Sequence, residues 1–115
     1  GRVGDSPVIG AGTYADSKIA GVSCTGEGEY FIRLCIAHDV IASMAYQRLS
    51  VGDATRMVLQ KLEPMKGKGG IIALDRYGNP AMVFNTSAMF RAYGNAEGQH
   101  EIAIFSDIIR SSDAP

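Results

Sequence analysis

The sequence lacks the features that membranes and nucleic acids require of a protein. No stretch approaches the roughly 20 consecutive apolar residues of a membrane-spanning helix. The formal net charge is −1, so the chain has no positive excess to attract nucleic acid or acidic lipid. Its first residues show no charged segment followed by an apolar run, which a signal peptide would need. We therefore predict no membrane or nucleic-acid partner, and a cytoplasmic location.

Cysteine and histidine are also scarce, with two of each in the chain. Cys24 and Cys35 lie in apolar sequence, which favours two buried reduced thiols over a disulfide. His38 and His100 are far apart and have no neighbours at ligand spacing, so the sequence predicts no metal site. His38 is expected to be buried in a helix beside a surface acid, Asp39. No cofactor is expected.

The composition that remains is that of an ordinary globular protein. The chain has 115 residues, of which 46% are hydrophobic and 20% charged, so it is one domain or part of one. Turn residues and apolar patterns predict the following elements after a turn-rich opening: a strand at 19–24, helices at 29–46 and 51–62, strands at 71–75, 81–85, 89–91 and 101–105, and a loose tail at 106–115. This order is typical of an α+β layered domain with an antiparallel sheet.

The expected helices and turns have specific signals. The segment 29–46 has no glycine or proline and is apolar over most of its circumference, which predicts a helix buried on more than one side. Ser50 and Asp53 resemble a capping box at the start of the second helix. Pro64 and the glycines after it would end that helix. The sequence Arg-Tyr-Gly-Asn at 76–79 is a good hairpin turn.

The segment Thr-Gly-Glu-Gly at 25–28 joins the first predicted strand to the long predicted helix. Backbone N–H groups at such a junction point outward, and glycine lets a ligand approach the main chain closely. These are the requirements of an oxyanion hole. The alternative is a plain helix N-terminus with Thr25 as its cap, and spacing alone favours that alternative.

Arg2 and Asp5 lie close together in the glycine-spaced opening. A guanidinium suits bidentate binding of a carboxylate, and an aspartate suits binding of an ammonium. Both groups on one loop would hold the α-carboxylate and α-amino group of an amino acid. A surface ion pair or a turn-capping aspartate is the commoner reason for such a pattern.

Taken together, these segments resemble the β subunit of plant-type L-asparaginases, also called isoaspartyl aminopeptidases. The resemblance extends over nearly the whole chain, up to about residue 105. It rests on these motifs: GRVGDSP at 1–7, GAGTYA at 10–15, SCTGEGE at 23–29, FIR at 31–33, GGIIALD at 69–75, FNT at 84–86 and MFR at 89–91.

The resemblance implies an N-terminal-nucleophile hydrolase with an αββα sandwich. Residues 1–115 would be a partial β subunit of a single such domain, with antiparallel strands and two helices. In this family a precursor cleaves itself by autoproteolysis, and the threonine exposed at the start of the β subunit becomes the nucleophile, with its own α-amine as base. The reaction implied is hydrolysis of L-asparagine or of β-aspartyl (isoaspartyl) dipeptides, with release of L-aspartate.

The resemblance also assigns site residues. Arg2 would bind the substrate α-carboxylate and Asp5 its α-ammonium. The Thr25 hydroxyl and the Gly26 backbone N–H would stabilise the oxyanion. Gly28 would line the pocket and help to hold the ammonium through its carbonyl. These assignments favour the functional interpretation of both motifs over the structural one.

The chain departs from the family pattern at its start. The first residue, Gly1, has no side chain that could act as a nucleophile. The threonines are internal, at 13, 25, 55 and 86, so none has the free amine that the mechanism needs. We expect the nucleophilic threonine and two strands to lie upstream, and the isolated chain to be inactive and to aggregate because a sheet edge and a helix face would be uncovered.

The expected partners are the α subunit and the missing N-terminal β segment, in a dimer of αβ units that forms a heterotetramer. The only cofactor that the resemblance allows is a structural monovalent cation in the partner subunit. Three alternatives stay open: a glycosylasparaginase-like hydrolase, a non-catalytic amino-acid-binding remnant of the fold, and a fragment produced by proteolysis.

Overall fold

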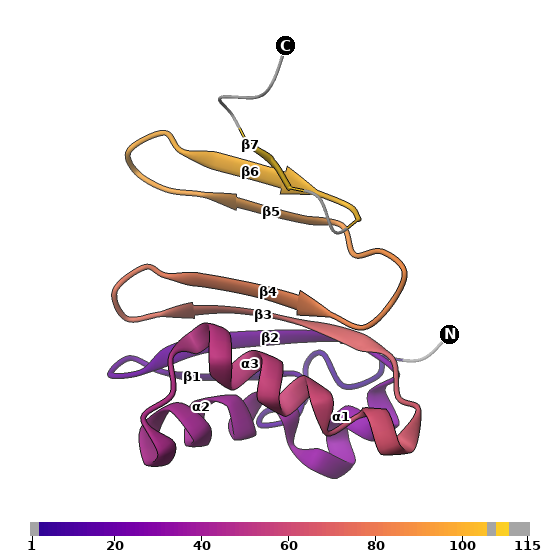
Figure 1. Cartoon of the computed structure of the whole chain (residues 1–115). Coiled ribbons are helices and arrows are strands. Elements are labelled where there is room, and N and C mark those ends of the chain that lie inside the picture. Colours follow the sequence, from indigo (N-terminus) through magenta and orange to yellow (C-terminus); the bar gives the residue numbers. More distant parts are fainter. Residues whose placement is uncertain (1–2, 106–107, 111–115) are drawn as a thin grey trace. The chain divides into compact units, whose positions relative to one another are not determined.

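The computed structural model of the chain describes residues 3–105 and the backbone of residues 108–110 (Figure 1). The chain divides into two compact units, Gly1–Asn85 and Thr86–Pro115. Each unit contains its own antiparallel sheet. The α+β class and the antiparallel pairing predicted from the sequence are therefore confirmed.

The first unit is built on a sheet in the order β1-β2-β3-β4, with every neighbouring pair antiparallel. Its strands are β1 (Thr13–Asp16), β2 (Ala20–Gly26), β3 (Gly69–Asp75) and β4 (Pro80–Phe84). The central pair β2 and β3 runs in register from Ala20 opposite Asp75 to Gly26 opposite Gly69. Strand β1 lies in the opening that was expected to be only turns and extended chain.

Helices cover one face of this sheet (Figure 1). They are α1 (Gly28–Leu34), α2 (Ile36–Gln47) and α3 (Val51–Gln60), followed by the short 3-10 segment η1 (Glu63–Met65). The core lies between helices and sheet, and its fully buried side chains include Phe31, Ile36, Val40, Val58, Leu62 and Ile71. Burial alternates along β2, where Val22 and Cys24 are buried while Ser23 and Thr25 are exposed.

The predicted single helix at 29–46 is wrong, because the chain breaks at Cys35. This residue has a left-handed backbone (φ 49°) that ends α1 and starts α2. The first N–H groups of α2 do not bond back along a continuous helix. Instead the amides of Ala37 and His38 donate to the carbonyls of Ala11 (3.0 Å) and Gly10 (2.9 Å). The break is a tertiary effect of the opening loop, which local composition does not report.

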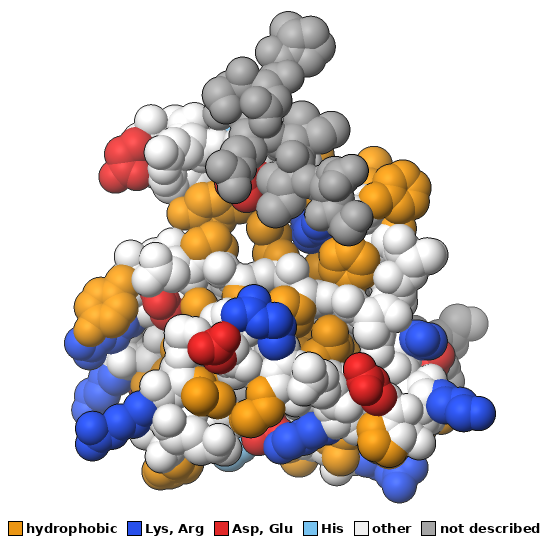
Figure 2. Space-filling view, viewed as in Figure 1, with side chains coloured by type: hydrophobic (Ala, Val, Ile, Leu, Met, Phe, Trp, Pro, Cys, Tyr) orange, Lys and Arg blue, Asp and Glu red, His pale blue; other side chains and the backbone are white. Residues whose placement is uncertain are grey.

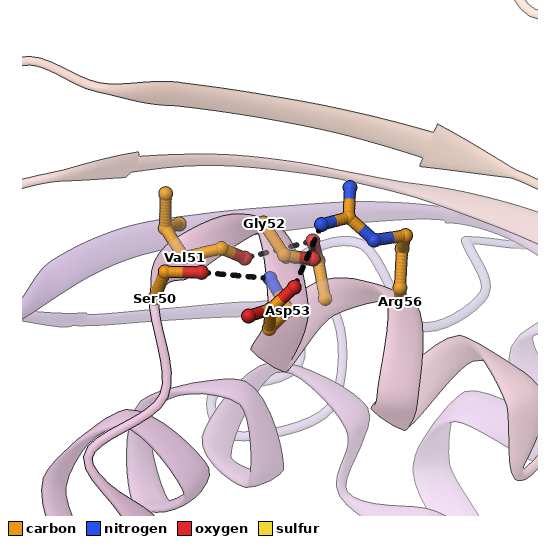
Figure 3. Close-up of polar contacts among 6 residues, drawn as sticks. Ser50, Val51, Gly52, Asp53 and Arg56 are labelled. Carbon is orange, nitrogen blue, oxygen red and sulfur yellow. Dashed lines mark hydrogen bonds and ion pairs between the residues drawn. The ribbon is translucent and has the colours of Figure 1, made fainter.

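The N-cap of α3 is confirmed. Ser50 Oγ accepts a hydrogen bond from the Asp53 N–H at 3.1 Å (Figure 3). Asp53 does not complete the reciprocal box; its carboxylate accepts a hydrogen bond from Arg56 at 2.8 Å. Hydrogen bonding with the Arg56 side chain, and then with the Ser50 side chain, lowers the pKa of Asp53. The helix itself ends at Gln60, slightly before the predicted residue 62.

Replacing Ser50 with alanine is expected to lower the free energy of unfolding by about 1 kcal/mol, because the Asp53 N–H loses its acceptor. That corresponds to a fall in melting temperature of roughly 4–8 °C for a domain of this size. Thermal unfolding followed by circular dichroism measures the change. Ser50→Asp keeps an acceptor at the cap and should remain close to wild type, and equal losses in both variants would contradict the assignment.

The hairpin turn between β3 and β4 is also confirmed. Asp75 Oδ1 accepts from the backbone N–H groups of Tyr77 (2.9 Å) and Asn79 (2.8 Å). Desolvation, the largest single effect, raises the pKa of Asp75, but the hydrogen bonds from Asn79, Tyr77 and Gly78 outweigh it and the net pKa is lowered. The turn was recognisable because Gly78 readily adopts the positive φ needed there (87°) and because Asp75 and Asn79 are side chains that form local turn bonds.

The second unit contains β5 (Arg91–Gly94), β6 (His100–Ala103) and β7 (Ile108–Arg110), paired antiparallel in that order. A turn at 95–98 joins β5 to β6, and Asn95 Oδ1 accepts from the N–H groups of Glu97 and Gln99. The strand expected at 89–91 instead begins at Arg91, and the one expected at 101–105 begins and ends earlier. The prediction of a loose tail is wrong for β7; the other tail residues lie outside those described.

The prediction for the thiols is confirmed in part, and the prediction that His38 is buried is wrong. Cys24 and Cys35 are both free, but only Cys24 is buried, since the helix break leaves Cys35 exposed. His38 is exposed rather than buried, with the Tyr14 ring against it at 5.0 Å between centroids. Asp39 forms an ion pair with Lys61 of the α3 C-terminus at 2.5 Å.

Basic and acidic side chains are interspersed on the face of the molecule shown in Figure 2. Within residues 3–105, no cluster of histidine, cysteine and acidic side chains has the makeup of a metal site. The helices that the structure describes are all too short or too polar to cross a bilayer.

Candidate functional site

The candidate site lies where β2 ends and α1 begins. Thr25 and Gly26 are the last residues of β2, and Gly28 is the first of α1. The N-cap of α1 is Glu27, and it makes no side-chain capping bond. Thr25 is therefore not the helix cap, which removes the structural alternative considered from the sequence. Its side chain is exposed on the sheet face opposite the helices.

Gly26 has a backbone that other residues rarely adopt. Its φ is +145°, and an added Cβ would lie 2.4 Å from the carbonyl oxygen of Lys68. Successive N–H groups of a strand point to alternate sides. The Glu27 N–H donates to the Lys68 carbonyl at 2.9 Å, on the β3 side of β2. The Gly26 N–H therefore points to the opposite side of β2, at a level beyond Thr13, the first residue of β1. An amide directed away from the β3 ladder is the kind of donor that oxyanion holes use.

The short first helix changes the electrostatics predicted for this junction. The long helix expected at 29–46 would have aligned many peptide dipoles behind the site. Because the chain breaks at Cys35, α1 spans only the 7 residues Gly28–Leu34. The helix dipole therefore contributes less positive charge at this junction than the predicted long helix would have.

Asp5 is a buried carboxylate with unused acceptor capacity. The residue is 2% exposed, and its Oδ2 has no hydrogen-bond partner among the residues that the structure describes. Desolvation raises the pKa of Asp5, an effect that its own backbone N–H partly offsets. Buried polar atoms almost always find partners. Asp5 Oδ2 is therefore an acceptor that the described part of the chain leaves unused.

The structure brings Asp5 and Gly28 together. A Cβ added to Gly28 would lie 2.8 Å from the Asp5 nitrogen and 3.2 Å from its Oδ1. The absence of a side chain at position 28 thus lets the Asp5 segment approach the start of α1. Arg2, the predicted carboxylate-binding residue, lies outside the described residues, so its place in the site stays a prediction.

Cys24 is a neighbour of this site that sequence reasoning treated only as core. Burial and the nearby charge of Asp5 together raise the pKa of the Cys24 thiol to about 12. At neutral pH the sulfur is therefore a neutral thiol and not a nucleophile. Its burial was predictable from strand alternation, but its proximity to Asp5 was not, since the opening loop folds onto β2 only in the tertiary structure.

Asn85 was noticed in the sequence only as part of a motif, and the structure gives it a role. Its side chain donates to the Gly67 carbonyl at 2.8 Å and accepts from the Gly69 N–H at 2.8 Å. These two hydrogen bonds fix the start of β3, where Gly69 pairs with Gly26. The side-chain amide thus supports the end of β2 from the neighbouring strand.

A separate cavity of about 290 Å³ lies at the other end of the sheet. Its walls come from the β1–β2 turn, the α2–α3 connection and the β3–β4 turn, and include Lys18, Arg48 and Tyr77. The predicted site residues do not line it. It has no part in the site at the end of β2.

Comparison with known proteins agrees with the resemblance seen in the motifs. The family model described as asparaginase matches residues 1–104. An isoaspartyl peptidase of Salmonella typhimurium is 53% identical over 97 residues, which are 84% of this chain and 31% of that protein. An isoaspartyl peptidase of Escherichia coli is also 53% identical over 97 residues, covering 84% of the chain and 30% of the relative.

A plant relative shows the same relationship. A probable isoaspartyl peptidase/L-asparaginase of Arabidopsis thaliana is 46% identical over 106 residues, which are 91% of this chain and 32% of the relative. The chain thus spans about a third of the length of the curated relatives that it matches.

Proposed function

Because the chain belongs to the asparaginase family, we propose that it forms the substrate-binding and oxyanion-stabilising part of a threonine-nucleophile amidohydrolase. The reaction is hydrolysis of L-asparagine and of β-aspartyl dipeptides, with release of L-aspartate. The names of the relatives, isoaspartyl peptidase and isoaspartyl peptidase/L-asparaginase, support this substrate class.

The observation that carries the proposal is Asp5 Oδ2, a buried acceptor without a partner among the described residues. An α-ammonium bound there would satisfy Oδ2 and would relieve the cost of a desolvated charge. Arg2 would bind the α-carboxylate of the same substrate. The carbonyl of Gly28, which lies beside Asp5, would accept a further hydrogen bond from the ammonium.

The strand end supplies the transition-state part of the site. The attacked amide carbonyl becomes an oxyanion, and the Thr25 hydroxyl and the Gly26 N–H would donate to it. The nucleophile would be the N-terminal threonine of an upstream segment of the β subunit, activated by its own α-amine. Attack expels ammonia or an amino acid and leaves an acyl-enzyme, which water hydrolyses to aspartate.

The open face of the first sheet supports an αββα assembly. Ile72 and Leu74 of β3 are each 47% exposed on the face that the helices do not cover. A second sheet layer from the rest of the protein would bury these side chains. We include the α subunit and the upstream β segment as the partners that complete the sandwich, in a dimer of αβ units. A cytoplasmic location and the absence of a cofactor in this chain stay predictions.

Replacing Thr25 with valine is expected to lower kcat by roughly 10²–10³-fold with little change in KM, since it removes one oxyanion donor and keeps the shape of the side chain. Ser23→Ala is the matched control, because Ser23 lies on the same face of β2 and should leave kcat unchanged. Aspartate release from asparagine and from an isoaspartyl dipeptide measures both variants.

Intact mass and N-terminal sequencing of every polypeptide in the purified protein should precede these assays. A companion chain that begins with threonine, together with aspartate release, would support the proposal. Release from a glycosylated asparagine, with little activity on isoaspartyl dipeptides, would instead indicate a glycosylasparaginase-like enzyme. Binding of aspartate without any hydrolysis or partner chain would indicate an amino-acid-binding remnant of the fold.

A further inference from the structure

The Asp5–Ser6 peptide lies directly against Gly12. A Cβ added to Gly12 would be 2.1 Å from the Asp5 carbonyl oxygen and 2.6 Å from the Ser6 Cα. Gly12 is buried and has no unusual φ, so its glycine is required by space and not by backbone conformation. The absence of a side chain at Gly12 lets the loop that carries Asp5 pack directly against it.

Ser6 ties this loop to β2. Its Oγ donates to the Cys24 carbonyl at 3.2 Å. The N–H of the same Cys24 donates to the Gly12 carbonyl at 2.8 Å. Both backbone polar groups of Cys24 therefore hold the opening loop: its carbonyl accepts from the Ser6 side chain, and its N–H donates to the Gly12 carbonyl. Cys24 directly precedes Thr25, so the loop is held at a fixed place relative to the predicted oxyanion donors.

From this geometry we infer that Ser6 is a positioning residue for Asp5. This inference rests on the proposed function. The hydrogen bond from Ser6 to Cys24 sets where the Asp5 carboxylate lies relative to Thr25 and Gly26. It thereby sets how well a substrate can place its α-ammonium and its scissile carbonyl at the same time. Ser6 itself would touch neither group.

The expected consequence is selectivity for ligands with a free α-amino group. Loss of one ordinary hydrogen bond should raise KM for L-asparagine by about three- to tenfold. Succinamate carries the same side-chain amide and carboxylate but has no α-amino group, so it does not use Asp5. Its kcat/KM should change less than twofold in the same variant.

The test compares Ser6→Ala with Ser6→Thr in the assembled protein. The threonine variant keeps the hydroxyl and should restore KM for asparagine to near the wild-type value. Ser17→Ala is the control, since Ser17 is an exposed serine in the β1–β2 turn at the other end of the strands. Equal losses on asparagine and succinamate, or no rescue by threonine, would overturn the positioning role.

Ligand binding separates this inference from the proposed function. Calorimetric titration with L-aspartate and with succinate gives the ratio of the two affinities in wild type and in each variant. If the protein binds aspartate but hydrolyses nothing, the proposed reaction fails, and a lower aspartate-to-succinate ratio in Ser6→Ala alone would still support the role of Ser6. If wild type binds neither ligand, both are overturned.

Discussion

Replacing Asp5 with asparagine should nearly abolish turnover of asparagine while making the fold more stable. The amide is almost the same size as the carboxylate but carries no charge to pair with an α-ammonium. Removing one partner of a buried charge pair costs about 2–5 kcal/mol, so kcat/KM should fall by roughly 30-fold to several thousand-fold. The rates of aspartate release in the assembled protein measure this loss.

The gain in stability follows from the raised pKa of Asp5. Desolvation lifts this pKa above its ordinary value of 3.8, so the native state binds the proton more tightly than the unfolded state does. The contribution of Asp5 to the free energy of unfolding is then most favourable below pH 3.8, and it falls as pH rises through the raised pKa. At neutral pH the ionised carboxylate therefore carries a desolvation cost in the native state. An asparagine at this position does not have this cost.

Unfolding of wild type and Asp5→Asn over a range of pH tests this expectation. The variant should be the more stable protein at pH 7, and the difference should shrink towards pH 4. Asp16→Asn is a suitable control, because this residue lies at the far end of β1. A variant that is less stable than wild type at pH 7 would show that the carboxylate has a stabilising partner in the assembled protein.

Replacing Gly69 with alanine is expected to damage the first unit strongly. The new Cβ would lie 2.4 Å from Phe31 Cζ and 2.5 Å from the Thr25 carbonyl oxygen. Phe31 is fully buried, and the Thr25 carbonyl belongs to the sheet backbone, so neither can move away freely. Overpacking of this kind typically costs about 1–3 kcal/mol, and activity should fall too because Thr25 is displaced.

Gly21→Ala provides the matched control for this prediction. Gly21 lies in β2, and its added Cβ would meet only the Ala15 Cβ, at 4.0 Å. Thermal unfolding should place Gly21→Ala near wild type and lower the melting temperature of Gly69→Ala by roughly 4–8 °C for each kcal/mol lost. Similar melting temperatures for the two variants would mean that the Phe31 ring can repack.

Local chemistry explains which parts of the fold were predictable. The hairpin turn at 76–79 and the N-cap at Ser50 depend on bonds between residues close in the sequence, and both are confirmed. The break at Cys35 depends on carbonyls of Gly10 and Ala11. No pattern within the helical segment reports such distant acceptors, so the sequence predicts one helix where the chain forms two.

The candidate site divides in the same way. Residue types and the family motifs indicated Asp5, Thr25, Gly26 and Gly28 as a group, and the structure places Asp5 against Gly28. The lack of a partner for Asp5 Oδ2 and the burial of the residue were not predictable. Both depend on how the opening loop packs on β2. The close packing of this loop against Gly12 was missed for the same reason.

The close backbone contacts at glycines 12, 26, 28 and 69 limit how this site can be redesigned. Many of these contacts are with main-chain atoms, so new side chains at these positions would clash with the backbone. A mutant library for directed evolution would do better to keep these glycines and to vary other positions. The tight packing around these glycines thus also decides which positions an engineer can vary.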